Sequence, residues 1–234
     1  MIPDRAFYIE PDTISGQSFS LNKTESNHAI RVLRMSNGDD IALLDGKGMG
    51  YHGIIQSTNK IVKGEILEHF PNLGENDFNI ILAPALIKRD RFESMLEKAT
   101  ELGVAEIFPI LMDRSVKNKL NLERSTKIIH AAAKQSMRSR FPKILEPKPL
   151  NEILTQNGQI VCAMIGETST ISKLNLNNIE PVFVIVGPEG DFTESEIELM
   201  KNANVQFYNL GQRRLRSETA ALNSLSILNE LLNR

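Results

Sequence analysis

Apolar residues in the first third of the chain follow the pattern of short strands. The segments Asp40–Asp45, Gly50–Gln56 and Ile61–Leu67 carry apolar, often β-branched residues, and turn signals rich in Asn, Gly, Asp and Ser separate them. A short helix is expected before them, over Ser26–Arg34. Strands so closely spaced, without long helices between them, indicate a small barrel or sandwich. The polar, Pro- and Gly-containing stretch Phe70–Asn76 predicts a linker after it.

Beyond this stretch, predicted strands alternate with helices. The expected strands are Asn79–Ala83, Val104–Leu111, Gln159–Ile165, Pro181–Val186 and Gln206–Leu210. The expected helices are one that opens at Asp90 and ends before Gly103, then Leu122–Ser139, Glu194–Asn202 and Glu218–Leu232. We expect N-caps at Asp90, Thr193 and Ser217, with Glu93 and Glu196 as capping-box partners of the first two. The alternation predicts an α/β domain whose parallel sheet is covered on both faces, over residues 76–234, after a β domain over residues 1–72.

Composition and charge narrow the class of protein. The 234 residues are 41% hydrophobic, which suffices for a buried core, and the single cysteine, Cys162, is predicted to be a buried, inert thiol. Without a signal peptide or an apolar run of the roughly 18–20 residues that span a bilayer, we expect a cytoplasmic protein with no membrane partner. The net charge is −2, yet between Asp113 and Lys143 nine residues are basic and two acidic. A solvated helix face and a polyanion-binding surface both explain that cluster.

Two late strand-to-helix junctions are candidates for a ligand site, because ligands of open α/β sheets bind at the carboxyl ends of the strands. The first is the turn after Val186, where Gly187 and Gly190 let backbone approach a ligand. It has neither P-loop nor dinucleotide spacing, which argues against a dinucleotide-dependent oxidoreductase. The acidic Glu189 and Asp191 suit a ligand with positive charge and ribose hydroxyls, such as S-adenosylmethionine, although a plain tight turn has the same pattern.

The second junction lies before the final helix. Gly211 ends a strand, and Arg213, Arg214 and Arg216 follow it. Anion recognition and a solvated charged loop are equally good explanations of these arginines. A third junction, Met164–Glu167, carries little information on its own.

These motifs resemble a known family. Val186–Gly190 and Leu215–Ala220, in this order and spacing, are similar to motifs of the 16S ribosomal RNA uridine-N3 methyltransferase family, of the SPOUT class of knotted methyltransferases. His28–Arg34, Lys98–Val104 and Gln135–Arg138 resemble three further family motifs. The chain departs from the family pattern at three positions. The family usually has glycine where Asp191 stands, often an aliphatic residue where Arg214 stands, and often threonine where Ser217 stands.

The resemblance implies a fold and an activity. It predicts a PUA-like RNA-binding β-barrel followed by a SPOUT α/β domain with a C-terminal trefoil knot, in a homodimer. It predicts an enzyme that methylates N3 of a uridine in 16S rRNA, free or in the small ribosomal subunit, with S-adenosylmethionine as cofactor and no metal.

The resemblance also implies roles for residues. The predicted catalytic residues are Arg216, Glu218 and Thr219, with Arg216 stabilising the uridine anion; Glu218 acts as proton acceptor or, as we favour, orients Arg216. The predicted cofactor site comprises Ile165, Gly166, Gly187, Pro188, Glu189, Gly190, Leu210, Gly211, Leu215 and Arg216. The predicted RNA-binding residues are Arg31, Arg34, Lys88, Arg89, Arg91, Arg114, Lys117, Arg138 and Arg140.

Two other functions fit parts of the sequence. An RNA-binding protein without catalysis fits the basic cluster, but the intact loops Gly187–Gly190 and Leu210–Thr219 argue against it. A tRNA methyltransferase of the same class fits the loops, but the N-terminal β domain and the cluster Lys88–Arg91 fit the ribosomal family better.

Overall fold

The structure, a computed structural model, describes residues 2–115 and 119–233. Two compact units divide the chain: the residues up to Glu75 together with Ala133–Phe141, and Asn76–Ala132 together with the residues from Pro142 onward. In the described part of the chain, no helix is both long and apolar enough to cross a membrane.

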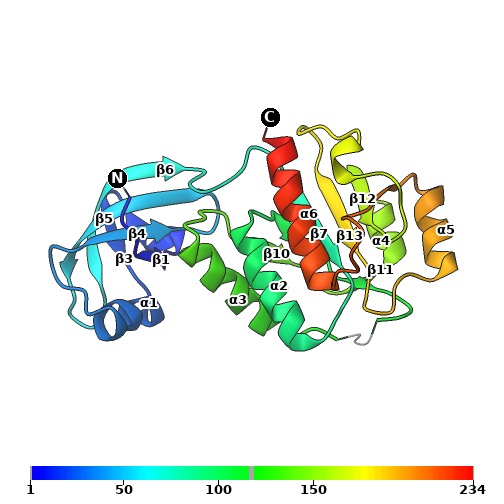
Figure 1. Cartoon of the computed structure of the whole chain (residues 1–234). Coiled ribbons are helices and arrows are strands. Elements are labelled where there is room, and N and C mark those ends of the chain that lie inside the picture. The colour runs from blue at the N-terminus through cyan, green and yellow to red at the C-terminus, as the bar shows by residue number, and fades with distance from the viewer. Residues whose placement is uncertain (1, 116–118, 234) are drawn as a thin grey trace. The chain divides into compact units, whose positions relative to one another are not determined.

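The first unit is built on a six-stranded sheet (Figure 1). Its strands, in spatial order, are β1 (Ala6–Tyr8), β4 (Asp40–Leu44), β5 (Met49–Ser57), β6 (Lys63–Pro71), β3 (Ser18–Ser20) and β2 (Ile14–Ser15). The three predicted strands are confirmed as β4, β5 and β6. The short 3₁₀ turn η1 (Pro11–Thr13) and the strands β1 to β3 were not predicted, because runs of two or three residues carry no measurable periodicity.

The predicted early helix is present but begins sooner. The helix α1 (Lys23–Asn27) starts after Asn22, whose side chain accepts a hydrogen bond from the Glu25 N–H at 2.9 Å. It continues as a π-helical turn, η2 (His28–Val32). Arg34 then adopts a left-handed backbone with φ of 54°, which ends the helical run.

The predicted linker Phe70–Asn76 contains the boundary between the two units, after Glu75, but most of the stretch is ordered within the first unit. The strand β6 runs through Pro71, and Asn72 and Gly74 form left-handed turns after it. Glu75 Oε2 lies 2.7 Å from Arg138 Nη2 in an ion pair whose side chains are only 8% and 3% exposed. The stretch is therefore polar because it holds the segment Ala133–Phe141, and the return of that segment to the first unit was not predicted.

The second unit contains the predicted parallel sheet. In spatial order its strands are β10 (Lys143–Ile144), β8 (Glu106–Ile107), β7 (Ile80–Pro84), β13 (Val182–Val186), β12 (Gln159–Ala163) and β14 (Gln206–Tyr208). Every pairing between these neighbours is parallel. A second, two-stranded parallel sheet joins β9 (Ile110–Leu111) to β11 (Lys148–Pro149).

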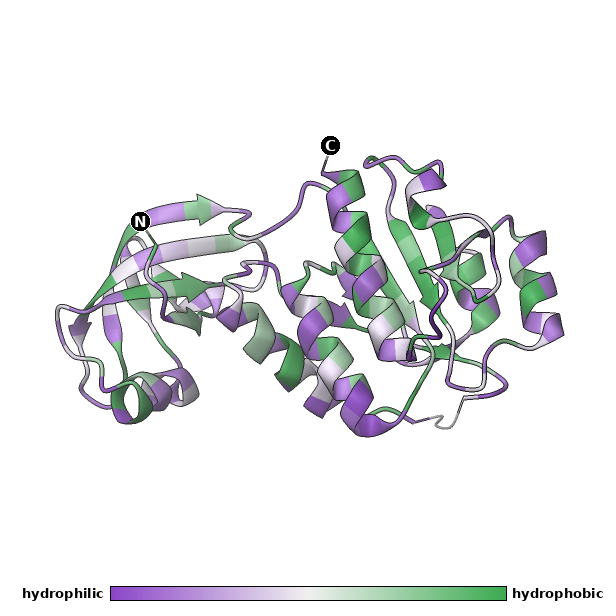
Figure 2. Cartoon of the chain, in the orientation of Figure 1, coloured by the Kyte–Doolittle hydropathy of each residue, from purple (hydrophilic) through white to green (hydrophobic). Residues whose placement is uncertain are grey.

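Helices cover both faces of the larger sheet, as predicted (Figure 1). Val184 of β13 packs in a core with α2 (Arg89–Glu101), α3 (Leu122–Gln135) and α6 (Ser217–Leu232), beside the 3₁₀ turn η3 (Ile171–Lys173). Ile185 faces the other core, which α4 (Leu150–Leu154) and α5 (Glu194–Asn202) complete. Cys162 is fully buried there, as predicted, and burial raises the pKa of its thiol. Figure 2 shows the central strands coloured as hydrophobic between helices that carry polar residues on part of their surface.

Several predicted boundaries in this unit are wrong. The predicted strand Val104–Leu111 is divided around Pro109, which has no N–H for a sheet hydrogen bond. The predicted helix to Ser139 ends at Gln135, because Met137 adopts a left-handed φ of 59°.

The helix N-termini were predicted with mixed success. The capping box of Thr193 and Glu196 is present at α5. Asp90 does not cap α2, since the N-cap is Lys88 and Glu93 instead pairs with Arg89 and Arg124. The N-cap of α6 is Arg216 rather than Ser217.

Candidate active site

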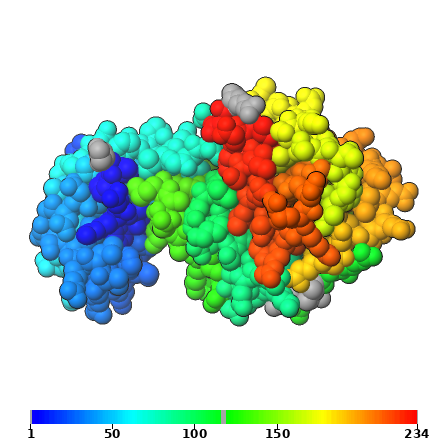
Figure 3. Space-filling model, in the orientation of Figure 1, coloured from blue at the N-terminus to red at the C-terminus, as the bar shows by residue number. Residues whose placement is uncertain are grey.

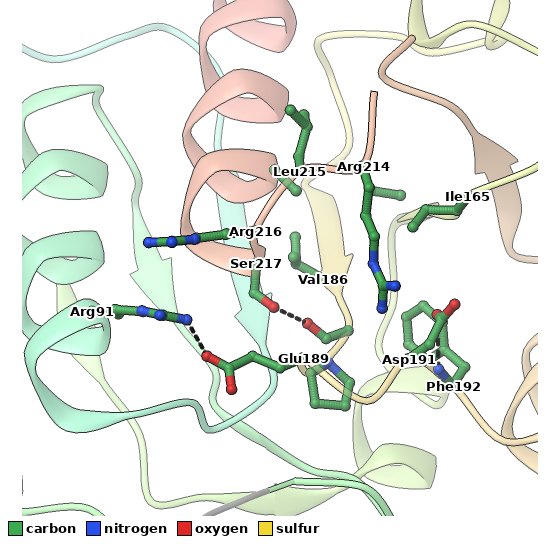
Figure 4. Close-up of a pocket in the computed structure, with 14 residues that line it drawn as sticks. Arg91, Ile165, Val186, Glu189, Asp191, Phe192, Arg214, Leu215, Arg216 and Ser217 are labelled. Carbon is green, nitrogen blue, oxygen red and sulfur yellow. Dashed lines mark hydrogen bonds and ion pairs between the residues drawn. The ribbon is translucent and has the colours of Figure 1, made fainter. Parts of the chain in front are cut away.

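The loops that follow β12, β13 and β14 meet at one pocket of about 380 Å³ (Figure 4). It lies at the carboxyl ends of three neighbouring parallel strands, where α/β sheets bind ligands. Its lining residues are Arg91, Ala163, Ile165, Val186, Gly187, Pro188, Glu189, Asp191, Phe192, Arg214, Leu215, Arg216, Ser217 and Ala220.

A smaller cavity of about 60 Å³ adjoins this pocket, since both are lined by Ala163, Ile165, Leu215 and Ala220. Leu210 and Gly211, two predicted cofactor residues, line the smaller cavity only. Six other predicted cofactor residues line the larger pocket; these are Ile165, Gly187, Pro188, Glu189, Leu215 and Arg216. Gly166 and Gly190 line neither.

The turn after β13 is fixed by its own hydrogen bonds. The Asp191 N–H donates to the Pro188 carbonyl at 3.1 Å, and Asp191 Oδ1 accepts from the Phe192 N–H at 2.9 Å. Asp191 has a left-handed φ of 62°, which glycine adopts at lower cost. Arg114 Nη1 donates to the carbonyls of Gly190 and Phe192, each at 3.1 Å, and so braces the turn on both sides of Asp191.

Gly187 is required by packing inside the protein. A Cβ atom there would lie 2.8 Å from Cζ of Phe192, whose ring forms part of the pocket wall. The Gly187 carbonyl accepts a hydrogen bond from Ser217 Oγ at 2.7 Å, which ties the turn to the start of α6. The loop and the helix that carry the site are therefore linked directly.

One end of the pocket is lined by ion-paired charges. Arg91 forms an ion pair through Nη1 with Glu189 Oε1, and its Nε lies 3.7 Å from Glu218 Oε1. Arg91, predicted to bind RNA, thus lines the pocket. Glu218 is beside it but is not a lining residue, and Thr219 is exposed on α6 away from the lining.

The arginines before α6 diverge in direction. Figure 4 shows Arg216 extending alongside Arg91, whereas Arg214 extends toward Asp191 and Phe192. The segment between β14 and α6 is at the surface, in orange-red beside the red helix in Figure 3. Sequence reasoning left open whether Arg214 recognises an anion, and did not include it among the predicted cofactor residues. It also did not select the apolar walls Ala163, Val186, Phe192 and Ala220, although their position at strand and helix ends was a usable signal.

The predicted RNA-binding residues are dispersed over both units. Exposed side chains are those of Arg31 and Arg34 near η2, Lys88 and Arg89 at the start of α2, Arg114, and Arg140, which also donates to Asn72 Oδ1 at 3.1 Å. Arg138 is wrong as a surface contact, because it is 3% exposed and paired with Glu75. Lys117 lies outside the described residues.

Part of the basic excess between residues 113 and 143 is neutralised by ion pairs. Beyond the buried Arg138, three cations of this cluster contact carboxylates. These pairs are Arg124–Glu93, Lys127–Glu123 and Lys134–Glu25, each with a nitrogen–oxygen distance of 2.6 Å. The cluster is therefore less of a polyanion-binding surface than its sequence indicates.

Family profiles match both parts of the chain. The profile described as "RNA methyltransferase domain" matches residues 74–229, and the one described as "RNA methyltransferase PUA domain" matches residues 21–67. A parallel sheet with helices on both faces and a pocket at its carboxyl edge, together with these matches, defines an RNA methyltransferase enzyme.

Individual relatives narrow this class. Ribosomal RNA small subunit methyltransferase E of Bacillus subtilis is 30% identical over 90% of this chain and 89% of its own length. The enzyme of the same name from Mesomycoplasma hyopneumoniae is 31% identical over 87% of this chain and 90% of its own. The chain belongs to the ribosomal RNA small subunit methyltransferase E family. The Neisseria gonorrhoeae member, crystallised bound to S-adenosyl methionine, superimposes with a TM-score of 0.88 at 29% identity, over 97% of this chain and 98% of that one.

Proposed function

We propose that this protein transfers a methyl group from S-adenosylmethionine to N3 of a uridine in 16S rRNA. One observation supports the proposal most strongly. The loops after β12, β13 and β14 form a pocket at the carboxyl ends of these strands, in a chain that matches the RNA methyltransferase domain profile. The residues present fit the cofactor. Asp191, which makes no ion pair among the described residues, offers negative charge to the cationic end of the cofactor, and Ile165 and Leu215 offer apolar surface to an adenine. When bound, the cofactor supplies an electrophilic methyl group.

Residues of the protein must accept the proton that the uridine imide loses and stabilise the negative charge that remains. N3 is a weak acid, and its lost proton leaves negative charge on the flanking carbonyl oxygens. Arg216, permanently charged and on the pocket wall, is placed to stabilise that anion. Among the described residues, Glu218 pairs with Arg91, at 3.7 Å, and not with Arg216 as favoured from the resemblance. Glu218 therefore holds Arg91 in place together with Glu189, or accepts the proton. The predicted catalytic role of Thr219 stays a prediction from the resemblance.

We propose the SPOUT fold for the second unit, with a trefoil knot in its C-terminal segment, in a cytoplasmic enzyme. Family membership supports this, as does the meeting of the loops after β12, β13 and β14 at one pocket. Knots are rare in proteins, so strand order alone does not imply one.

We also propose that the protein is a homodimer. The apolar stripe of α6, with Leu225, Leu228 and Leu232, does not support a dimer, because it is buried in the core of its own unit. The family resemblance is the remaining support. Sedimentation at micromolar concentration tests the proposal, and a monomer would contradict it.

We propose that exposed arginines and lysines in each unit contact the RNA; these are Arg31, Arg34 and Arg140 in the first unit and Lys88 and Arg89 in the second. Phosphate contacts make RNA affinity fall steeply with salt. Reversing Lys88 and Arg89 to Glu should weaken 16S rRNA binding and flatten its salt dependence while leaving cofactor affinity unchanged. Arg91 is left intact in this test because it lines the pocket. Salt-independent binding would contradict the proposal.

Cofactor titration separates the proposed enzyme from an RNA-binding protein without catalysis. Calorimetry of the whole protein with S-adenosylhomocysteine should show saturable binding, and ATP and NAD should not compete. Absence of binding by folded protein would remove the cofactor assignment.

A further inference from the structure

Asp191 and Arg214 carry opposite charges and line the same pocket. They come from different loops, the turn after β13 and the segment before α6. Figure 4 shows the Arg214 side chain pointing toward the turn that carries Asp191. This end of the pocket therefore holds one carboxylate and one guanidinium.

Both charged groups are available to a ligand. Among the described residues, the ion pairs at this pocket are made by Arg91, with Glu189 and Glu218, and not by Arg214 or Asp191. Arg91 therefore compensates the charge of Glu189 at the other end. The walls between are apolar, with Val186, Phe192 and Leu215 among them.

The Asp191 carboxylate is also held in place. Its Oδ1 accepts from the Phe192 N–H at 2.9 Å, and Arg114 braces the carbonyls on either side at 3.1 Å. Asp191 keeps a left-handed backbone, for which an aspartate costs more than a glycine. The backbone conformation therefore does not favour aspartate here, and what the aspartate adds at this position is its carboxylate.

We propose that Arg214 and Asp191 form a subsite for an amino-acid zwitterion, the α-carboxylate and α-ammonium of the cofactor's methionine portion. The planar guanidinium donates two parallel hydrogen bonds to a carboxylate, and the aspartate accepts from an ammonium. This inference rests on the proposed function, because it assigns part of the same cofactor. It adds two residues that set cofactor specificity in this chain.

The test compares two ligands by calorimetry on the whole protein. S-adenosylhomocysteine carries both charged groups, and 5′-methylthioadenosine carries neither. Arg214→Leu should raise the Kd for S-adenosylhomocysteine about tenfold, as expected for one charge-assisted contact, and leave that for 5′-methylthioadenosine unchanged. Asp191→Gly, which suits the left-handed backbone, should act in the same direction. Lys201→Leu, which removes an exposed cation from α5, is the matched control and should change neither Kd.

The outcomes separate this inference from the proposed function. Selective loss of S-adenosylhomocysteine affinity in both pocket variants supports the subsite. Equal loss for both ligands, or no loss, overturns it, and so does weakened RNA binding with cofactor affinity intact. Failure of the unmodified protein to bind either ligand instead overturns the cofactor assignment itself, and the subsite with it.

Discussion

Arg216 is the N-cap residue of α6 and also lines the pocket. The start of the helix therefore fixes the backbone position from which its side chain extends. Arg216→Ala should reduce single-turnover methylation about 10²–10³-fold with cofactor and RNA both saturating, because a donor aimed at developing charge is lost. Arg216→Lys should also be impaired, since the ammonium lacks the planar fork.

The control for Arg216 must lie outside the pocket. Arg214 is unsuitable, because it lines the same pocket, and Arg213 lines the smaller cavity. Lys201→Ala on the exposed side of α5 serves instead. Methylation by Arg216→Ala at the unmodified rate would remove any catalytic role for Arg216. If a higher concentration of cofactor or RNA restored the methylation rate of Arg216→Ala, the role of Arg216 would be to bind that partner.

At the scale of single residues, the sequence predicted which loops form the pocket better than it predicted the role of each side chain. The strand-to-helix turn indicated Gly187 and Glu189, the family resemblance indicated Leu215, and all three line the pocket. Sequence reasoning assigned Arg91 to RNA, because only the folded chain brings α2 beside Glu189, 98 residues later. It placed Arg138 on the surface, because charge alone does not reveal that Glu75 buries it.

Ser217 links the first turn of α6 to the turn after β13. Its Oγ donates to the Gly187 carbonyl at 2.7 Å, so Ser217→Ala should lower the free energy of unfolding by about 1 kcal/mol. Urea denaturation measures this. Ser217→Thr keeps the hydroxyl and should lose much less. Equal losses in the two variants would show that the hydroxyl is not what matters.

Glu93 joins α2 to α3 through Arg124, and hydrogen bonds from Arg124 and Arg89 lower its pKa to about 2. A lowered carboxyl pKa stabilises the fold above the unfolded value near 4.5, and this contribution is lost as the pH falls toward 2. Glu93→Gln should therefore cost up to about 1 kcal/mol at pH 7, as exposed pairs do, and less at pH 3. Urea melts at both pH values measure the difference. A cost that is the same at both would contradict the ion-pair explanation.

At the scale of helices and strands, local sequence signals predicted those elements whose position depends on neighbouring residues. The capping box of Thr193 and Glu196 located α5, and five-residue apolar runs located β12 and β13. The α2 N-terminus was misplaced because Glu93 pairs with two arginines instead of capping. The strands β10 and β11 were missed, since two-residue strands depend on partners far along the chain.

At the scale of the whole molecule, a buried ion pair keeps the segment Ala133–Phe141 in the first unit. Glu75→Ala should destabilise the protein by about 3–5 kcal/mol, because Arg138 stays buried after its carboxylate is removed. Hydrogen exchange should rise in the first unit, while S-adenosylhomocysteine affinity, which depends on the second, stays unchanged. Glu68→Ala, on the exposed side of β6, is the control. Uniform loss of protection in both units would contradict this division.

The division into a β unit and an α/β unit follows from hydrophobic periodicity, but two large-scale features do not. The return of residues 133–141 to the first unit depends on long-range contacts such as Phe141 N–H to the Gly46 carbonyl at 3.0 Å. The proposed knot is likewise a property of chain threading, to which local patterns are insensitive.

The most direct test of the central claim is the identity of the product. Purified protein is incubated with 16S rRNA and S-adenosylmethionine carrying an isotopically labelled methyl group, and the RNA is digested to nucleosides for mass spectrometry, with Arg216→Ala in parallel. We predict labelled 3-methyluridine from the unmodified protein and at least a hundredfold less at early times from the variant. An unlabelled RNA after incubation with folded protein that binds both partners, or a label on any other atom, would contradict the account.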